Sequence, residues 1–254
     1  MAVIAVFNQK GGVGKTTTTL NVAASLALLD RKPVVLDLDP QGHVSMALGV
    51  RHPPSHATLA AFFRDKTPLD RLLRRLDNGI RLIPGHADLS KIDAMLGSTP
   101  GVASSLKRGL EAGLAWEEAP ILIDCAPAMG VLSLNALFAA ERVLIPVTAD
   151  YLSIQGLNRL DMALNVLEAP LKRRIERRVV LTRFDETKPL CRDALANLKS
   201  RYGERLCETR IQDDPALSES PAHGMDIFAY SADSAGAHDY RLLTMELLSK
   251  GFFH

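Results

Sequence analysis

The sequence QKGGVGKTT, residues 9–17, decides the fold of this chain. It follows an apolar run, AVIAVF, and precedes TTTTLNVAASLALL, a stretch of small and apolar residues typical of a buried helix. A strand, a glycine-rich loop and a helix in this order, with Gly-Lys-Ser/Thr at the end of the loop, predict a phosphate-binding site. The loop departs from the general pattern twice: Gln9 stands where the first glycine is expected, and Lys10 adds a second lysine.

The residues of this loop have chemical reasons to hold a nucleoside triphosphate. Glycines let backbone N–H groups approach phosphate oxygens without a Cβ clash, and the helix N-terminus adds a favourable dipole. Lys15 can reach the β- and γ-phosphates, and the hydroxyl group of Thr16 can ligate Mg²⁺. A dinucleotide-binding loop is excluded, because Thr17 occupies the position of its last glycine. The predicted nucleotide-binding residues of the loop are Lys10, Gly11, Gly12, Val13, Gly14, Lys15, Thr16 and Thr17.

Composition favours a globular protein of the reducing cytoplasm. The 254 residues are 47% hydrophobic, which is enough for a substantial core. Lys and Arg number 30 against 29 Asp and Glu, so net charge does not indicate a nucleic-acid-binding protein, and any basic surface must be local. The three cysteines have no disulfide or metal-site spacing, and no apolar stretch reaches the length of a membrane span.

Apolar runs of strand length alternate with helical stretches along the whole chain. Most of these runs are continuous Val, Ile and Leu, which is typical of strands covered on both faces. The predicted fold class is therefore α/β: a single domain over residues 1–254, with a doubly wound, mostly parallel sheet flanked by helices. The expected strands are Ala2–Phe7, Pro33–Leu38, Ile80–Ile83, Pro120–Cys125, Arg142–Val147, Arg178–Thr182 and Arg205–Ile211, and the clearest helices are Thr16–Leu29, Ser153–Leu167 and Leu190–Arg201.

Acidic residues end two of the predicted strands. VVLDLDPQG places Asp37 and Asp39 two residues apart on one strand face, and PILIDCAPAMG ends its strand in Asp124. Ligands of such sheets bind outside the carboxyl ends of the strands, so we expect these carboxylates beside the phosphate-binding loop. There Thr16, Asp37 and Asp124 would hold the Mg²⁺ shell, Asp39 would orient an attacking water, and the turn PAMG would sense the γ-phosphate. The alternative is a strand-end aspartate that only makes a turn before Pro40.

KGGVGKTT, DLDPQG and LIDCAPAMG, in this order and spacing, resemble the ParA branch of the ParA/MinD ATPases. The later stretches LSLNAL, VLIPVTADYLSIQGL and LSESPAHGMDI agree, so the resemblance covers essentially the whole chain. It implies a P-loop fold with a deviant Walker A loop, ATP and Mg²⁺ as cofactors, and weak hydrolysis that a ParB-like or cargo-adaptor protein stimulates. It also implies an ATP-bound sandwich homodimer that binds DNA non-specifically, associates with the nucleoid and positions a plasmid, a chromosome locus or a protein assembly.

The resemblance also assigns roles to the charged residues. It makes Lys10 the signature lysine, which reaches the nucleotide of the other subunit, whereas Lys15 serves its own subunit. Asp39 matches the aspartate required for hydrolysis, and Asp37 is its supporting partner. An ATP molecule buried between two chains carries several negative charges, and a lysine from each partner would offset them, so dimerisation would depend on nucleotide.

This sequence departs from the family in the segment that frames adenine. RIQDDPALSE places Gln212 and Asp214 where the family usually has proline and asparagine, although Asp214 can still accept a hydrogen bond from the adenine amino group. Asp213 and Ala216 replace arginines that touch DNA in the family, which argues against DNA binding through this segment.

A basic run, LKRRIERRVV, is a substitute DNA-binding candidate. Its five cations are Lys172, Arg173, Arg174, Arg177 and Arg178. Such a run either contacts phosphates or forms a solvated helix end, and the sequence leaves both open. LDRLLRRL, with Arg71, Arg74 and Arg75, is a weaker candidate that we interpret as a plain surface helix.

Other functions remain as alternatives. A MinD-like ATPase would bind membrane through DYRLLTMELLSKGFFH, but this stretch lacks a strongly basic face, so core packing by Leu242, Met245 and Leu248 is the favoured interpretation and no membrane partner is expected. A nucleotide-switched regulatory module with little turnover is a second alternative. An iron–sulfur reductase lacks the necessary cysteines, and Cys125 is read as a small buried residue.

Overall fold

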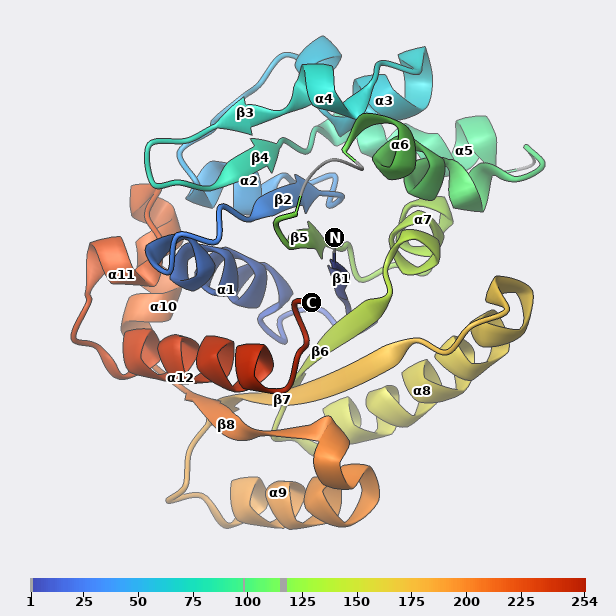
Figure 1. Ribbon diagram of the computed structural model, residues 1–254. Helices are drawn as coiled ribbons and strands as arrows, with labels where there is room; N and C mark the ends of the chain where they lie inside the picture. The colour runs from blue at the N-terminus through green and yellow to red at the C-terminus, as the bar shows by residue number, and fades with distance from the viewer. Residues whose placement is uncertain (1, 98, 115–117) are drawn as a thin grey trace.

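The computed structural model describes residues 2–97, 99–114 and 118–254. Within these residues the strands form one sheet of eight, in the order β3-β4-β2-β5-β1-β6-β7-β8 (Figure 1). Their bounds are β1 Val3–Val6, β2 Val34–Asp37, β3 Arg74–Arg75, β4 Arg81–Ile83, β5 Ile121–Asp124, β6 Arg142–Thr148, β7 Glu176–Phe184 and β8 Leu206–Gln212.

Helices connect and cover these strands. The α-helices are α1 Lys15–Leu28, α2 His43–Ala47, α3 Leu59–Asp65, α4 Leu69–Leu72, α5 Ile92–Leu96, α6 Ser105–Gly113, α7 Val131–Ala139, α8 Tyr151–Leu171, α9 Pro189–Tyr202, α10 Pro215–Glu219, α11 Ile227–Tyr230 and α12 Ala235–Ser249. Short 3₁₀ helices are η1 Ser55–Ala57, η2 Ala87–Lys91, η3 Val102–Ser104, η4 Gly203–Arg205 and η5 Ser220–His223.

The sheet is parallel except at one edge, where β3 pairs with β4 antiparallel. β1 lies between β5 and β6, so the strand order reverses direction at β1. A parallel sheet has its ligand crevice at such a switch point, outside the carboxyl ends of the strands. The loop that follows β1 is therefore at the position where the topology predicts a ligand.

Both faces of the sheet are buried, because successive strand residues point to opposite sides. In β1, Val3 and Ala5 belong to the apolar core under α3, α6, α7, α8 and α9, whereas Ile4 and Val6 belong to the core under α1 and α12. Figure 1 shows α1 and α12 together on one side of the strands, with α7 and α8 across from them. This double coverage explains why the strands read as continuous apolar runs.

The seven strands and three helices expected from the sequence are confirmed, with small shifts of their ends. The prediction for LDRLLRRL was wrong in part. α4 ends at Leu72, and Arg74 and Arg75 form β3, in which Arg75 lies opposite Arg81. A two-residue antiparallel edge strand has no apolar run of its own, so apolar periodicity could not reveal it.

Candidate nucleotide-binding site

The loop between β1 and α1 has the backbone of an anion-binding turn. Gly12 and Gly14 have φ of 74° and 84°, in the left-handed region that glycine adopts without strain. Gly14 is the N-cap of α1 and offers no side chain to the first turn of the helix. The backbone N–H groups of this turn can therefore bind phosphate oxygens, helped by the dipole of α1.

Lys15, the first residue of α1, is buried, with 7% of its surface exposed. Its Nζ donates a hydrogen bond to the backbone oxygen of Lys10 at 2.9 Å. Burial lowers the pKa of Lys15, while the carboxylates of Asp124 and Asp39 act in the opposite direction. The cation is thus held beside the acidic strand ends and under the glycine-rich loop, where a phosphate group would replace water as its partner.

The two acidic strand ends meet as the sequence predicted. Asp37 and Asp124 are register partners at the ends of β2 and β5, and both are fully buried. The Thr16 hydroxyl group donates to Asp124 Oδ2 at 2.9 Å, and that of Thr19 donates to Oδ1 at 3.1 Å. Burial, followed by repulsion from Asp37, raises the pKa of Asp124 well above its ordinary value. A site that places two carboxylates side by side favours a bound cation.

Asp37 is fixed by the helix that follows it. Asp37 Oδ2 accepts hydrogen bonds from the Ser45 backbone N–H at 3.0 Å and from the Ser45 hydroxyl group at 2.5 Å. Gly85, after β4, packs so closely that a Cβ there would lie 2.8 Å from Asp37 Cγ. Burial raises the pKa of Asp37 to about 6, although the hydrogen bonds from Ser45 act in the opposite direction.

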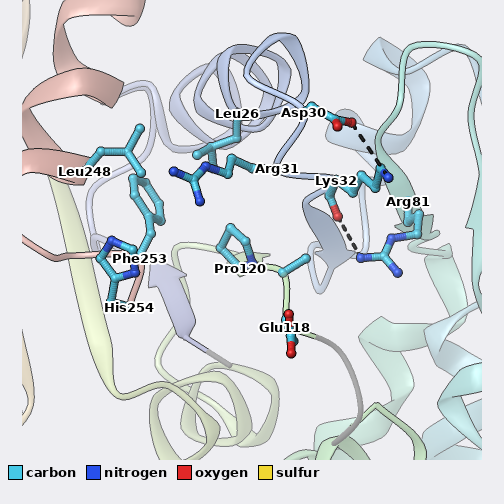
Figure 2. A pocket seen from close by; sticks show the side chains of 11 residues that line it. Leu26, Asp30, Arg31, Lys32, Arg81, Glu118, Pro120, Leu248, Phe253 and His254 are labelled. Carbon is cyan, nitrogen blue, oxygen red and sulfur yellow. Dashed lines mark hydrogen bonds and ion pairs between the residues drawn. The ribbon is translucent and has the colours of Figure 1, made fainter.

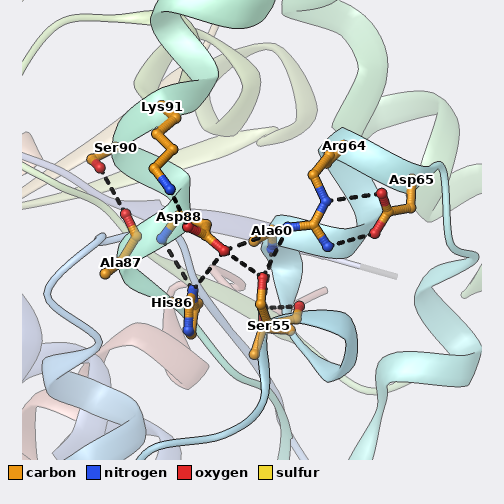
Figure 3. Close-up of polar contacts among 10 residues, drawn as sticks. Ser55, Ala60, Arg64, Asp65, His86, Ala87, Asp88, Ser90 and Lys91 are labelled. Carbon is orange, nitrogen blue, oxygen red and sulfur yellow. Dashed lines mark hydrogen bonds and ion pairs between the residues drawn. The ribbon is translucent and has the colours of Figure 1, made fainter.

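The loop that carries Gly85 is itself anchored by a polar cluster, drawn in Figure 3. Asp88 accepts hydrogen bonds from Lys91 Nζ at 2.8 Å and from the Ser55 hydroxyl group at 2.6 Å, and Arg64 Nη1 lies 3.4 Å away. The hydrogen bonds from Lys91 and Ser55 lower the pKa of Asp88, so it remains ionised near neutral pH. This cluster ties the end of α3 to the segment that packs against Asp37.

Asp39 lies just beyond the strand end and is 9% exposed. Its Oδ1 accepts the backbone N–H of Gln41 at 2.9 Å, and its own N–H donates to Asp37 Oδ1 at 3.2 Å. The carboxylate therefore makes the turn that the alternative interpretation expected. Its charge also acts on Lys15, Asp37 and Asp124, so it belongs to the same site.

These oxygen groups fit a hydrated Mg²⁺ ion. Magnesium usually takes one or two protein ligands together with waters and phosphate oxygens, rather than a full protein cage. The described residues contain no group of three or more His, Cys, Asp or Glu able to hold a metal ion, which agrees with that mode. The hydroxyl group of Thr16 and the carboxylates of Asp124 and Asp37 are the oxygen ligands that this site offers.

Lys10, the second lysine of the loop, has a partner that the sequence did not reveal. Its Nζ donates to both carboxylate oxygens of Asp150, at 2.8 and 2.9 Å, and to the Ser153 hydroxyl group at 2.7 Å. Asp150 is the N-cap of α8, and hydrogen bonds from Lys10, Thr148 and Ser153 lower its pKa, outweighing the rise caused by burial. The two side chains keep 36% and 37% of their surface exposed, so the ion pair can open toward solvent.

The two adenine candidates lie at the end of β8. The Asp214 carboxylate caps α10 through the Ala216 N–H at 2.9 Å and accepts the Gly236 N–H at 2.7 Å. The backbone N–H of Gln212 donates to Asp239 at 2.8 Å, and its side chain also hydrogen-bonds Asp239. Adenine recognition by Gln212 and Asp214 stays a prediction, and Asp214 has a structural task in addition.

The basic run does not form the patch that the sequence suggested. Arg177 is 6% exposed, and its guanidinium group donates to Asp161 at 2.6 Å, to Asn165 at 2.8 Å and to Glu168 at 2.5 Å. Arg173 donates to the Ala140 backbone oxygen at 2.5 Å. Arg178 donates to the Glu204 backbone oxygen, so it too has a local partner. Lys172 and Arg174 are exposed, so the five cations do not form one exposed patch, and DNA contact by the remaining members of the run stays a prediction.

A second basic group lies around a pocket of about 360 Å³ between the end of α1 and the start of β2 (Figure 2). Arg31, Lys32 and Arg81 line it together with the acidic residues Asp30 and Glu118. Lys32 Nζ lies 3.8 Å from Asp30, and Arg81 Nη2 donates to the Lys32 backbone oxygen at 2.7 Å. The sequence analysis did not single out this group, because Arg81 lies about 50 positions after the adjacent pair Arg31 and Lys32.

The C-terminal stretch packs into the core, as favoured over membrane binding. Leu243, Leu247 and Phe252 are buried against the sheet, whereas Leu242 and Met245, which the sequence analysis named as core residues, are exposed. In the part of the chain that the structure describes, no helix has the length and apolar character needed to cross a membrane. Cys125, Cys191 and Cys207 are free and buried.

Several residues of the site escaped the sequence analysis. Thr19 had a signal, because it lies three residues after Thr16 on the same helix face. Asp150 also had one, since it follows a predicted strand in the same way as Asp39. Gly85 and Ser45 had no signal in the sequence, because their role depends on how α2 and the loop after β4 pack against Asp37.

Comparison with known proteins agrees with this geometry. An AAA domain family model matches residues 1–177. The chromosome-partitioning ATPase Soj of Thermus thermophilus is 35% identical over 97% of this chain and 95% of its own length, and the chromosome partitioning protein ParA of Caulobacter vibrioides is 32% identical over 98% and 95%. Among solved structures, cobyrinic acid a,c-diamide synthase of Mycobacterium smegmatis, with an ATP analogue and magnesium bound, has a TM-score of 0.82 and 28% identity, and covers 99% of this chain and 97% of its own. The chain belongs to the ParA family of P-loop ATPases.

Proposed function

We propose that this protein is a Mg²⁺-dependent ATPase whose bound ATP creates a sandwich homodimer that positions a cargo. The observation that carries the proposal is the alignment of Asp37 with Asp124, register partners beside the first turn of α1, which carries Lys15 and Thr16. A buried lysine, a hydroxyl group and carboxylates around one anion-binding turn are the parts that phosphoryl transfer requires. The solved relative bound to an ATP analogue and magnesium supports the same cofactors.

Each group of the site has a task in hydrolysis. Thr16, Asp124 and Asp37 would hold Mg²⁺, which would supply positive charge to offset that of the phosphates. Lys15 holds the terminal phosphates, and its low exposure keeps competing water away. Asp39 is the only one of the three carboxylates with measurable exposure and orients the attacking water.

Lys10 makes the dimer depend on ATP. In the single chain its ammonium group is bound by Asp150 and Ser153, outside the contacts of Lys15. We infer that a second subunit's nucleotide offers this lysine a more highly charged partner, so the ion pair opens when two ATP-bound chains meet. Hydrolysis then removes the bridge and lets the dimer separate. The ion pair is partly exposed, so opening it costs little.

DNA and a stimulating protein complete the proposed cycle. The sequence relatives are a chromosome-partitioning ATPase and a chromosome partitioning protein, which supports DNA as a partner and the nucleoid as the place of action. The buried ion pairs of Arg177 with Asp161 and Glu168 argue against this arginine as a DNA contact. Binding of the dimer to duplex DNA should weaken steeply with salt, because it rests on phosphate contacts.

The test is Asp39→Ala, which removes the proposed orienting carboxylate and leaves Lys10 and Lys15 in place. With ATP and Mg²⁺, the variant is expected to accumulate as a long-lived dimer in sedimentation velocity runs and to lose ATP hydrolysis. The matched control is Asp30→Ala, since Asp30 has 87% of its side chain exposed and lies in the loop between α1 and β2. An Asp39→Ala protein that hydrolyses ATP at the parental rate would contradict this role. A parent with ATP-dependent dimers but no turnover, even with DNA and partner present, would identify a regulatory module instead.

A further inference from the structure

Helix α7 takes its N-terminal cap from a different helix. α7 begins at Val131, and its N-cap residue, Gly130, has no side chain with which to bond the first turn. Asp93, on α5, supplies the missing acceptor: its Oδ1 accepts the Val131 N–H at 2.7 Å. Helix N-termini favour such an acceptor both as a hydrogen-bond partner and as a negative charge.

The contact between the two helices is so close that a side chain at position 130 would displace the Asp93 carboxylate. A Cβ on Gly130 would lie 2.2 Å from Asp93 Oδ2. The φ of Gly130 is −132°, which any residue can adopt, so backbone conformation does not explain the glycine. The close approach of the Asp93 carboxylate is what a side chain at this position would disturb. A substitution of either residue, Asp93 or Gly130, is therefore expected to open the contact.

The capped end of α7 is also the end of the loop that leaves the nucleotide site. Residues 125–130 connect Asp124 to α7, and the Ser133 hydroxyl group holds this loop through the Ala128 backbone oxygen at 2.5 Å. At its other end, Asp124 is bonded by Thr16 and Thr19. Only six residues thus separate Asp124 from the first turn of α7, which Asp93 contacts.

Asp93 belongs to α5, and Figure 1 shows α5 and α6 beside α7. A second polar contact links the same parts: the Leu106 N–H, at the start of α6, donates to Asn135 on α7 at 2.9 Å. Asn135 is fully buried, whereas the Asp93 contact is open to solvent. An exposed hydrogen bond opens more easily than a buried one. Of the two hydrogen bonds that join α7 to α5 and α6, the one from Val131 to Asp93 is therefore the one that can open and close.

We propose that Asp93 is a positioning residue that couples the loop after Asp124 to α5 and α6, so that these helices move with the nucleotide state. The proposal rests on the ATPase function proposed above. A nucleotide that reorders residues 125–130 shifts the first turn of α7 relative to Asp93 and changes the surface formed by α5 and α6. A partner that binds α5 and α6 could then sense the nucleotide without touching it.

The test is hydrogen exchange followed by mass spectrometry on the full chain, with and without a non-hydrolysable ATP analogue and Mg²⁺. In the parent protein the analogue is expected to change exchange in residues 9–17 and 125–131 and also in α5 and α6. In Asp93→Ala the first two segments still respond, but α5 and α6 lose their response. Asp93→Asn, which keeps an acceptor oxygen of the same shape, restores it. Urea unfolding of each variant checks that the fold is kept.

Gly130→Ala gives an independent test through the same contact. Its added Cβ should separate Asp93 from α7 and abolish the response of α5 and α6. In an Asp93→Ala background it should change the exchange rates by less than about twofold, because the clash has been removed.

Two results would overturn the proposal. If α5 and α6 respond in Asp93→Ala as they do in the parent, or fail to respond in the parent while residues 9–17 are protected, Asp93 does not couple them. If residues 9–17 are not protected either, the proposed ATP binding fails, and this coupling fails with it.

Discussion

Two charged regions of this protein lie at opposite ends of its strands and have opposite characters. At the carboxyl ends, Asp37 and Asp124 lie side by side, and burial raises the pKa of both. At the amino end of β7, Arg177 is equally buried, but its guanidinium group has carboxylate partners on α8. One region is short of positive charge until a ligand arrives, whereas the other is already neutralised. The comparison teaches that a charge cluster indicates a binding site only where the fold leaves it unbalanced.

The largest expected effect comes from the balanced region. Arg177→Ala removes the close cation of Glu168 and leaves Asp161 with Arg205, 3.7 Å away, and we expect the free energy of unfolding to fall by about 2 to 4 kcal/mol, reduced from a fully buried pair because both carboxylates are partly exposed. Urea unfolding measures this loss. Arg174→Ala, at an exposed neighbour, is the control and should change stability by less than about 0.5 kcal/mol. Equal stability of the two variants would show that the Arg177 network is not structural.

The buried carboxyl groups of Asp37 and Asp124 should affect how the stability of the fold and the binding of ATP depend on pH. Because burial raises the pKa of Asp37 to about 6, the folded chain binds this proton more tightly than the unfolded chain. Protonation of Asp37 therefore stabilises the folded chain. This stabilisation is fully present below the ordinary aspartate pKa of about 4, and it is lost as pH rises through about 6. Binding of ATP with Mg²⁺ should strengthen over the same range, since the cation needs the ionised carboxylate.

Urea unfolding and ATP titrations between pH 4.5 and 7 measure the two trends. Asp37→Asn cannot ionise and should flatten both. A parent protein that becomes more stable across this range, with the same slope in Asp37→Asn, would contradict the assignment.

The smallest effect is expected at the ion pair that connects the phosphate loop to α8. Asp150→Asn keeps the N-cap acceptor of α8 but removes the negative charge that holds Lys10. A partly exposed ion pair contributes less than about 1 kcal/mol, so freeing Lys10 should tighten the ATP-dependent dimer about two- to fivefold. Sedimentation equilibrium can resolve this change. Weaker dimerisation would mean that Asp150 supports the dimer rather than competing with it.

Much of the fold and part of the site were predictable from the sequence, because their determinants are local. Continuous apolar runs define the strands, and the strand ends of a parallel sheet meet, which brought Asp37 and Asp124 together as expected. The failure at Arg177 is also instructive. Its partners Asp161, Asn165 and Glu168 are four and three residues apart on one stripe of α8, and the first two lie in the predicted helix Ser153–Leu167, so most of the pattern that neutralises Arg177 was readable.

Other features depend on contacts that no local pattern carries. The backbone and side chain of Asp37 press against Gly85, and the carboxylate of Asp93 lies where a Cβ of Gly130 would be. Neither glycine has a left-handed φ, and the motif that contains Gly130 did not indicate Asp93 as its neighbour. The partner of Lys10 lies 140 positions away in the chain, at the N-terminus of a helix that was itself predicted. The roles of the two glycines become visible only when the packing is known, whereas the position of Asp150 after a predicted strand was a signal in the sequence.

The central claim is that Lys10 acts on the nucleotide of a second subunit, whereas Lys15 acts on its own. The most direct measurement is the dimer dissociation constant of Lys10→Ala with a non-hydrolysable ATP analogue and Mg²⁺, alongside the affinity of the single chain for that analogue. We expect nucleotide affinity to stay within about threefold of the parent, while dimerisation weakens by about tenfold to 100-fold, the range of one lost charge-assisted hydrogen bond. Normal dimers, or a parallel loss of nucleotide binding, would contradict the account.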